Sequence, residues 1–151
     1  TGVNSPADAD VNTTYPDQYR FELSYTTPSS GSLNDFQPSF NGNIAAFTDA
    51  RSSIDDTGLP FRSAYTYRYD ARDQLTGASY YQLSNVTANN GRYDFPVVRY
   101  DPNGNILALK RKGVKADGTF GLIDDLKYFY NGNQLIKVDD HADQIKGFVN
   151  K

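Results

Sequence analysis

The stretch "YDPNGNILALKRK", from Tyr100 to Lys112, places a Pro-Asn-Gly turn between a tyrosine and a run of strand-forming residues. Pro102 presets φ at the second position of such a turn, and Gly104 can adopt the left-handed conformation that closes it with a β-bulge. The aliphatic residues that follow suit a second strand. The stretch therefore predicts a β-hairpin.

The same pattern recurs along the chain. "FNGNIAAF" begins at Phe40, "YDARDQLTGASY" at Tyr69 and "YNGNQLIKV" at Tyr130. At spacings of 31, 31 and 29 residues, the turns are followed by the strong aliphatic residues Ile44, Leu75, Ile106 and Leu135. A unit of about 30 residues that occurs four times is an internal repeat. Each unit is expected to form a strand, a tight turn, a second strand and a loop.

The four turns are expected at residues 41–43, 70–73, 101–104 and 131–132. Asn131-Gly132 predicts a two-residue type I′ hairpin, in which both central residues have positive φ. In the repeat at Tyr69, Asp73 stands where the other repeats have glycine. Because Asp tolerates left-handed φ better than most residues, a weaker turn is expected there.

The segments before the turns alternate in polarity. "YRFELSYT" from Tyr19, "AYTYRYD" from Ala64 and "LKYFYN" from Leu126 place aromatic or aliphatic residues at every second position. This period of two is typical of half-buried strands. Of 18 acidic residues only Glu22 is Glu, so the composition favours turns over helices. The sequence predicts an all-β fold, an antiparallel sheet of consecutive β-hairpins with little helix.

The ends of the chain differ from its middle. Residues 1–18 are polar, lack a period and contain two prolines, so we expect an arm or linker there. Residues 19–151 are expected to form one β-repeat domain of about four units. The chain opens on Thr1 and shows no signal-peptide pattern, which suggests a processed or excised piece whose export signal is not present in it.

Charge and composition narrow the classes of partner. A net charge of −3 and a pI near 5.0 argue against a nucleic-acid binder. The sequence has one basic cluster, formed by Lys110, Arg111, Lys112 and Lys115. It is expected to be a solvated strand end and loop. No apolar run approaches the ~20 residues that span a bilayer, so no membrane insertion is expected. The absence of cysteine excludes thiol catalysis, cysteine-based zinc sites and disulfides.

The single histidine and the acidic residues near it are candidates for a metal site. His141 lies beside Asp139, Asp140 and Asp143, but these carboxylates lack the spacing of a calcium loop. One histidine is also a poor basis for a zinc site. A solvated loop, with no metal and no cofactor, is therefore expected.

The paired aspartates at residues 55–56, 124–125 and 139–140 are candidates for the two carboxylates of a glycosidase. Adjacent residues on a strand point to opposite faces, so these pairs cannot act together across a cleft. A set of aspartates brought together from different repeats stays open. Since no nucleophile–base motif is visible either, we expect no catalytic residues and no enzyme activity.

The repeat motif resembles that of the bacterial Rhs or YD-repeat family over about residues 40–140. A Tyr-Asp followed by Asn-Gly-Asn and an aliphatic strand occurs at Tyr100–Ile106, and Gly121–Asp140 resembles a further repeat. The residues that carry the motif are Asn41, Gly42, Tyr69, Asp70, Tyr100, Asp101, Asn103, Gly104, Tyr130, Asn131 and Gly132.

The resemblance implies a structural role. In that family, hairpins lie edge to edge in a spiralling sheet, which closes into a shell in insecticidal toxin complexes, Rhs toxins and teneurins. This chain has too few repeats to close a shell, and no segment resembles the family's self-cleaving core or a toxin. The implied function is a non-catalytic segment of a large exported protein, forming part of an extracellular or cell-surface wall whose partners are neighbouring repeats.

Two questions stay open at this point. An exposed row of tyrosines can stack on sugar rings, so the alternative function is a cell-surface adhesion or carbohydrate-binding module. A slice of an array also has sheet edges that attract other strands. We therefore expect either self-association through an end hairpin or a terminus folded back across it.

Overall fold

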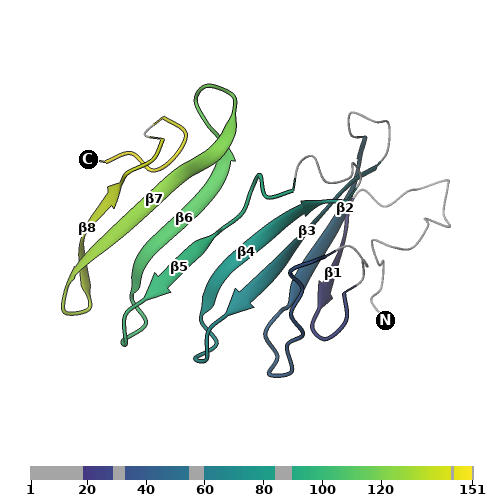
Figure 1. The fold of residues 1–151 in the computed structure, drawn as a ribbon, viewed down its shortest axis with the longest axis horizontal. Helices are drawn as coiled ribbons and strands as arrows, with labels where there is room; N and C mark the ends of the chain where they lie inside the picture. Colours follow the sequence, from purple (N-terminus) through teal and green to yellow (C-terminus); the bar gives the residue numbers. More distant parts are fainter. Residues whose placement is uncertain (1–18, 29–32, 55–59, 84–89, 144, 151) are drawn as a thin grey trace. The chain divides into compact units, whose positions relative to one another are not determined.

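The computed structural model describes residues 19–28, 33–54, 60–83, 90–143 and 145–150 (Figure 1). Within these ranges the regular structure is entirely β, in two four-stranded sheets. The predicted all-β fold of consecutive antiparallel hairpins is confirmed. The expected N-terminal arm lies outside the described residues.

Each sheet follows the order of the sequence. The first has the order β1-β2-β3-β4 and is formed by β1 (Tyr19–Ser24), β2 (Ala46–Ile54), β3 (Pro60–Tyr69) and β4 (Leu75–Gln82). The second has the order β5-β6-β7-β8 and is formed by β5 (Val97–Tyr100), β6 (Ile106–Val114), β7 (Phe120–Asn131) and β8 (Gln134–Asp140). Figure 1 shows the β5–β6 and β7–β8 turns at the same end of the second sheet.

The chain divides into two compact units whose boundary runs through the β3–β4 hairpin. The first unit holds the described residues up to Arg68 together with those of Tyr80–Asn90. The second holds Tyr69–Ser79 and the described residues from Gly91 onward. The tip of the β3–β4 hairpin therefore belongs to the same unit as strands β5 to β8.

The core of the first unit forms where a loop covers small side chains. Ala46 and Ala64 are fully buried, and Leu33 packs against them with Tyr81. Phe36 and Leu83 pack around this cluster. The segment between β1 and β2 therefore contributes to the core, because its Leu33 side chain fills the space that the small residues leave on the sheet.

The opposite face of β1 carries aromatic and aliphatic residues that are exposed. Tyr19 is 51% exposed and Phe21 54% exposed, whereas Ser24 on the other face is buried. The period-2 alternation predicted for this strand is present, but its polar face is the inner one. The reason is that Leu33 covers the Ser24 side of the sheet and supplies the apolar volume there.

Bulges recur at one place in the second unit. The register shifts between Arg99 and Tyr100 leave Leu107 of β6 as the extra residue, one position after Ile106. The shift between Phe129 and Tyr130 leaves Ile136 of β8 in the same position relative to its turn. A bulge increases the local strand twist. Both hairpins are therefore built alike after the turn as well as within it.

Candidate functional site: the ladder of turns

The turns at residues 70–74 and 101–105 have the same backbone. The N–H of Asp70 donates to the carbonyl of Gln74 (3.0 Å), and the N–H of Asp101 donates to the carbonyl of Asn105 (2.9 Å). The fourth residue is left-handed in both, with φ of 61° at Asp73 and 88° at Gly104. Asp73 thus adopts the conformation that glycine adopts in the other copy.

The aspartate of the Tyr-Asp pair caps its own turn. Oδ1 of Asp101 accepts hydrogen bonds from the N–H groups of Asn103 (2.8 Å) and Asn105 (2.9 Å). Asp70 accepts the equivalent pair from Arg72 (2.9 Å) and Gln74 (3.0 Å). Short side chains that accept from the backbone two residues on are a common turn device. The Asp in the motif is therefore explained by local structure.

These hydrogen bonds favour the ionised carboxylate. The side-chain amide of Asn105, followed by backbone N–H groups of the turn, lowers the pKa of Asp101 from its ordinary value of 3.8. The N–H of Gln74 is the main cause of the lowered pKa of Asp70. A group whose pKa is lower in the folded state stabilises the fold above its ordinary pKa, and this contribution is lost as pH falls.

We expect Asp101→Asn to be less stable than the wild type at pH 7 and closer to it in acid. The Asn keeps an oxygen that accepts from the turn but has no charge to lose, so the difference shrinks below about pH 3.8 as wild-type Asp101 becomes protonated. Urea unfolding at pH 7 and pH 3 measures this difference. A difference that stays constant with pH contradicts the assigned cause.

Neighbouring turns in the second unit bond to each other. The guanidinium of Arg72 donates to the carbonyls of Pro102 (3.0 Å) and Asp101 (3.3 Å). One turn further, the side-chain amides of Asn103 (3.3 Å) and Asn105 (3.1 Å) donate to Oδ1 of Asn133. Partners in this ladder lie 28 to 30 residues apart in the sequence. The turns at residues 70–74, 101–105 and 132–133 are thus bonded in succession.

The tyrosines of the motif add a second row of contacts. The hydroxyl of Tyr100 donates to the carbonyl of Leu75 (3.0 Å), and that of Tyr130 donates to the carbonyl of Ile106 (2.9 Å). In each case the acceptor is the first strand residue after the preceding turn. Burial, with a smaller contribution from the negative charge of Asp70, raises the pKa of Tyr100. A tyrosine at this position therefore ties one hairpin to the hairpin before it.

We expect Tyr100→Phe and Tyr130→Phe each to lower the free energy of unfolding by about 1 kcal/mol, the net value of one hydrogen bond. Tyr128→Phe is the matched control, because no hydrogen bond of its hydroxyl is seen within the described part of the chain. Chemical denaturation measures all three variants. Equal losses for Tyr128 and Tyr130 would show that the hydroxyl contacts do not join the hairpins.

The first and last turns differ from the prediction. Asn41 and Gly42 lie in the loop between β1 and β2 rather than in a tight hairpin, with Gly42 at φ 93°. In the last turn Asn131 ends β7, and the two loop residues are Gly132 and Asn133. Only Gly132 has positive φ (59°), as in a type II′ turn. The predicted type I′ turn is wrong, because the loop starts one residue later than the Asn-Gly pair suggests.

Each unit also contains a buried aspartate, paired with an arginine, that the sequence reasoning missed. Asp49 of β2 is opposite Ser63 of β3 and contacts its hydroxyl and the Nε of Arg51 (3.0 Å). In the second unit Arg111 is opposite Asp124, at 2.5 Å from Nε to Oδ2. Asp49 and Arg111 each come five residues after the aliphatic residue of their turn. Their fixed distance from the turn was the available signal.

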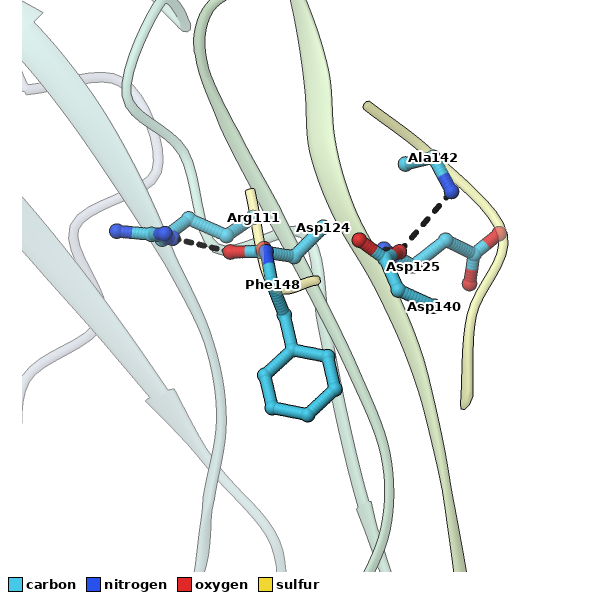
Figure 2. A network of polar contacts seen from close by, with 6 residues as sticks. All are labelled: Arg111, Asp124, Asp125, Asp140, Ala142 and Phe148. Atoms are coloured by element: carbon cyan, nitrogen blue, oxygen red, sulfur yellow. Dashed lines mark hydrogen bonds and ion pairs between the residues drawn. The ribbon is translucent and has the colours of Figure 1, made fainter. Parts of the chain in front are cut away.

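The C-terminal segment is tied to the same carboxylates. Figure 2 shows the Arg111 side chain and the main chain of Phe148 meeting at Asp124, whose Oδ1 accepts the N–H of Phe148 (2.7 Å). Beside them, Oδ1 of Asp140 accepts from the N–H groups of Asp125 (2.8 Å) and Ala142 (2.9 Å). The side chain of Asn150 also bonds the backbone of Asp140. Of the two outcomes expected at the sheet edge, the folded-back terminus is therefore present at the Asp140 end of β8.

Each cation of the predicted basic cluster has an acidic partner. Its cations pair with the acidic residues Asp125, Asp124, Asp94 and Asp117, in the order Lys110, Arg111, Lys112 and Lys115. Partners on the facing strand and in the neighbouring turns hold these side chains in place. The four side chains are 34% to 42% exposed, which agrees with the predicted solvated strand end and loop; the sequence did not predict their ion pairs.

The candidate metal and catalytic groups do not form a recognisable centre in the residues that the structure describes. No group of three or more His, Cys, Asp or Glu residues is placed there to hold a metal ion. His141 is exposed and borders a shallow depression of about 440 Å³ together with Lys115, Asp125 and Asp143. Asp124 and Asp125 point to different cationic partners. The pair at 55–56 lies outside the described residues.

Comparisons with known proteins identify no family. No protein-family model matches the chain, and no curated protein matches it either.

The described part of the chain has no helix with the length and hydrophobicity of a membrane span. The candidate functional site is therefore defined by its geometry alone, a ladder of turns that joins successive hairpins.

Proposed function

We propose that this chain is a structural segment of a large exported YD-repeat protein, in which its hairpins form part of an extracellular wall or shell. The observation that carries the proposal is the ladder of turns. Arg72 bonds the turn at Asp101, and that turn bonds Asn133, at offsets of about 30 residues. A contact that repeats with the sequence period can continue through further repeats without a change of geometry.

The polar residues of the repeat support a scaffold rather than a reaction centre. Asp101 is engaged by its own turn, and Asp124 by Arg111 and the main chain of Phe148. A catalytic carboxylate needs a face open to substrate. The proposal accordingly assigns no catalytic residue and no cofactor to this segment, and its partners are neighbouring repeats.

A second candidate, adhesion or carbohydrate binding, is favoured by one surface. Two exposed rings on β1, Tyr19 and Phe21, lie next to each other with centroids 6.2 Å apart. The half-buried ring of Phe47 on β2 lies 6.1 Å from Phe21. Planar rings presented side by side can stack on sugar rings. A glycan array separates the two candidates, since a wall segment gives no signal above that of a Phe21→Ala variant.

The location of the parent protein tests the wall proposal. Antibodies raised against residues 69–140 should label intact, unpermeabilised cells that produce the protein, or detect it in their medium. Protease added outside the cells should remove the cell-bound signal. Labelling that appears only after lysis, with none in the medium, would contradict the proposed extracellular wall.

A further inference from the structure

The outer edge of β8 is the end of the second sheet. The order β5-β6-β7-β8 leaves β8 with a sheet neighbour on one side only within the described residues. His141 donates its N–H to the carbonyl of Asp125 on β7 (3.2 Å). Because backbone groups point alternately to the two sides of a strand, those of Asp140 and Val138 point away from β7.

At Asp140 this edge is closed by a side chain that acts like a neighbouring strand. Oδ1 of Asn150 accepts the N–H of Asp140 (2.7 Å), and Nδ2 of Asn150 donates to the carbonyl of Asp140 (2.9 Å). These are the two bonds that a paired strand residue would exchange. We name residues 145–150 the strap.

A glycine lets the strap lie against the sheet. A Cβ at Gly147 would collide with the backbone carbonyl of Ile123 and approach Oδ1 of Asp124 to 2.6 Å. The strap is therefore held at Gly147, Phe148 and Asn150, next to the C-terminal end of β8. The N-terminal part of β8, from Gln134 to Lys137, is exposed, and includes Leu135 (48%) and Ile136 (63%).

β1 is the first strand in the order of the first sheet and has a sheet neighbour on one side only within the described residues. The carbonyl of Ser24 accepts the N–H of Ala45, at the start of β2 (2.9 Å), so the backbone groups of Leu23 and Phe21 point outward. The end of β1 lies beside the Asn41–Gly42 turn, since Ser39 donates its N–H to the carbonyl of Tyr25 (2.7 Å). The start of β8 lies beside the turn at Gly132.

We propose that the β8 edge from Gln134 to Val138 docks the β1 edge of a second copy of this chain. Antiparallel pairing brings the end of β1 to the start of β8, and so brings one copy's Asn41–Gly42 turn to the other's Gly132 turn. The junction thereby continues the ladder that links turns within the second unit. The strands also match in length, with six residues in β1 and seven in β8.

This inference rests on the proposed function in one respect: both assume that hairpins stack edge to edge. A single pair of short strands buries less than the roughly 1,200 Å² of a stable interface, so association is weak and depends on concentration. The strap limits it further because Asn150 occupies the outward groups of Asp140.

Proline variants test the two edges separately. Val138→Pro and Leu23→Pro each remove an outward N–H, while Val138→Ala and Leu23→Ala shorten the same side chains and keep it. In sedimentation velocity at high concentration, each proline variant alone should be monomeric, and the alanine variants should associate like the wild type. Circular dichroism establishes that each variant is folded.

An equimolar mixture of the two proline variants gives the sharpest result. Each retains the edge that the other lacks, so the mixture should form a dimer that grows no further. Association of Leu23→Pro alone would indicate β8–β8 pairing, and association of Val138→Pro alone would indicate β1–β1 pairing. Either result, or a wild type that stays monomeric at every concentration, overturns the proposal.

Release of the strap gives an independent check. Asn150→Ala frees the backbone groups of Asp140 and should strengthen association severalfold over the wild type. Unchanged or weaker association would overturn the strap's part in the proposal. Failure of any of these tests leaves the surface labelling of the parent protein unaffected, so it is distinguishable from failure of the proposed function.

Discussion

Replacing Arg111 by alanine is expected to lower the free energy of unfolding by about 3 kcal/mol, the low end of the cost of leaving a buried charge without its ion-pair partner. The side chain of Asp124 is only 4% exposed, whereas that of Arg111 is 42% exposed. Among the described ion pairs, Arg111 is the one cation that contacts Asp124, at 2.5 Å. Without Arg111 the carboxylate keeps the N–H of Phe148 but stays buried with an uncompensated charge. Urea denaturation at pH 7 measures the loss.

Lys110→Ala is the matched control for this prediction. Lys110 is adjacent to Arg111 on β6 and pairs with Asp125, the neighbour of Asp124, at 2.8 Å. The side chain of Asp125 is 31% exposed, against 4% for Asp124, so water can replace its lost partner. A loss below about 1 kcal/mol is expected, as for surface ion pairs. Equal losses for Arg111 and Lys110 would show that burial does not decide the strength of these pairs.

Replacing Leu33 by alanine should also lower the free energy of unfolding by about 3 kcal/mol. Leu33 is 7% exposed and packs on Ala46 and Ala64, which are too small to close the space that a shortened side chain leaves. Chemical denaturation followed by circular dichroism measures this effect. If the two units unfold in separate steps, the free energies of wild type and Leu33→Ala are compared for the step in which the first unit unfolds.

Leu23→Ala serves as the control for Leu33. It removes the same atoms from the same unit, but Leu23 is 39% exposed and lies on the opposite face of the sheet. A loss well below that of Leu33→Ala is expected, because less apolar surface leaves water at this position. A larger loss for Leu23 would place the core on the aromatic face and contradict the packing described here.

Period and turn chemistry were sufficient to predict the hairpins. Asn103 and Gly104 mark a turn by their backbone preferences, and the alternation around Tyr128 marks a strand by its period of two. Both are local properties of the chain. The face that becomes the core is not a local property, and the period of two on β1 does not tell which face is inward. Leu33, from the segment after β1, packs on the face of Ala46 and Ser24, and the aromatic face stays exposed.

The site was predicted in part for the same reason. The Tyr-Asp pairs were recognised by pattern, and the structure adds what they do: Asp101 caps its turn and Tyr100 bonds the preceding hairpin. The contact of Asn103 with Asn133 joins residues 30 positions apart, so it becomes visible only when hairpins are placed side by side. The one-residue shift at Gly132 reflects a choice between two turn types that the same residues allow.

Cross-linking of neighbouring turns tests the central claim, that hairpins stack turn on turn at a spacing of about 30 residues. The chain contains no cysteine, so two introduced cysteines report on one contact only. Asn103→Cys with Asn133→Cys should form a disulfide under mild oxidation, because these side chains meet at 3.3 Å. Asn103→Cys with Asp117→Cys, which places the second thiol in the β6–β7 turn, should not. A folded protein that cross-links the second pair as readily as the first, or does not cross-link the first, would contradict the account.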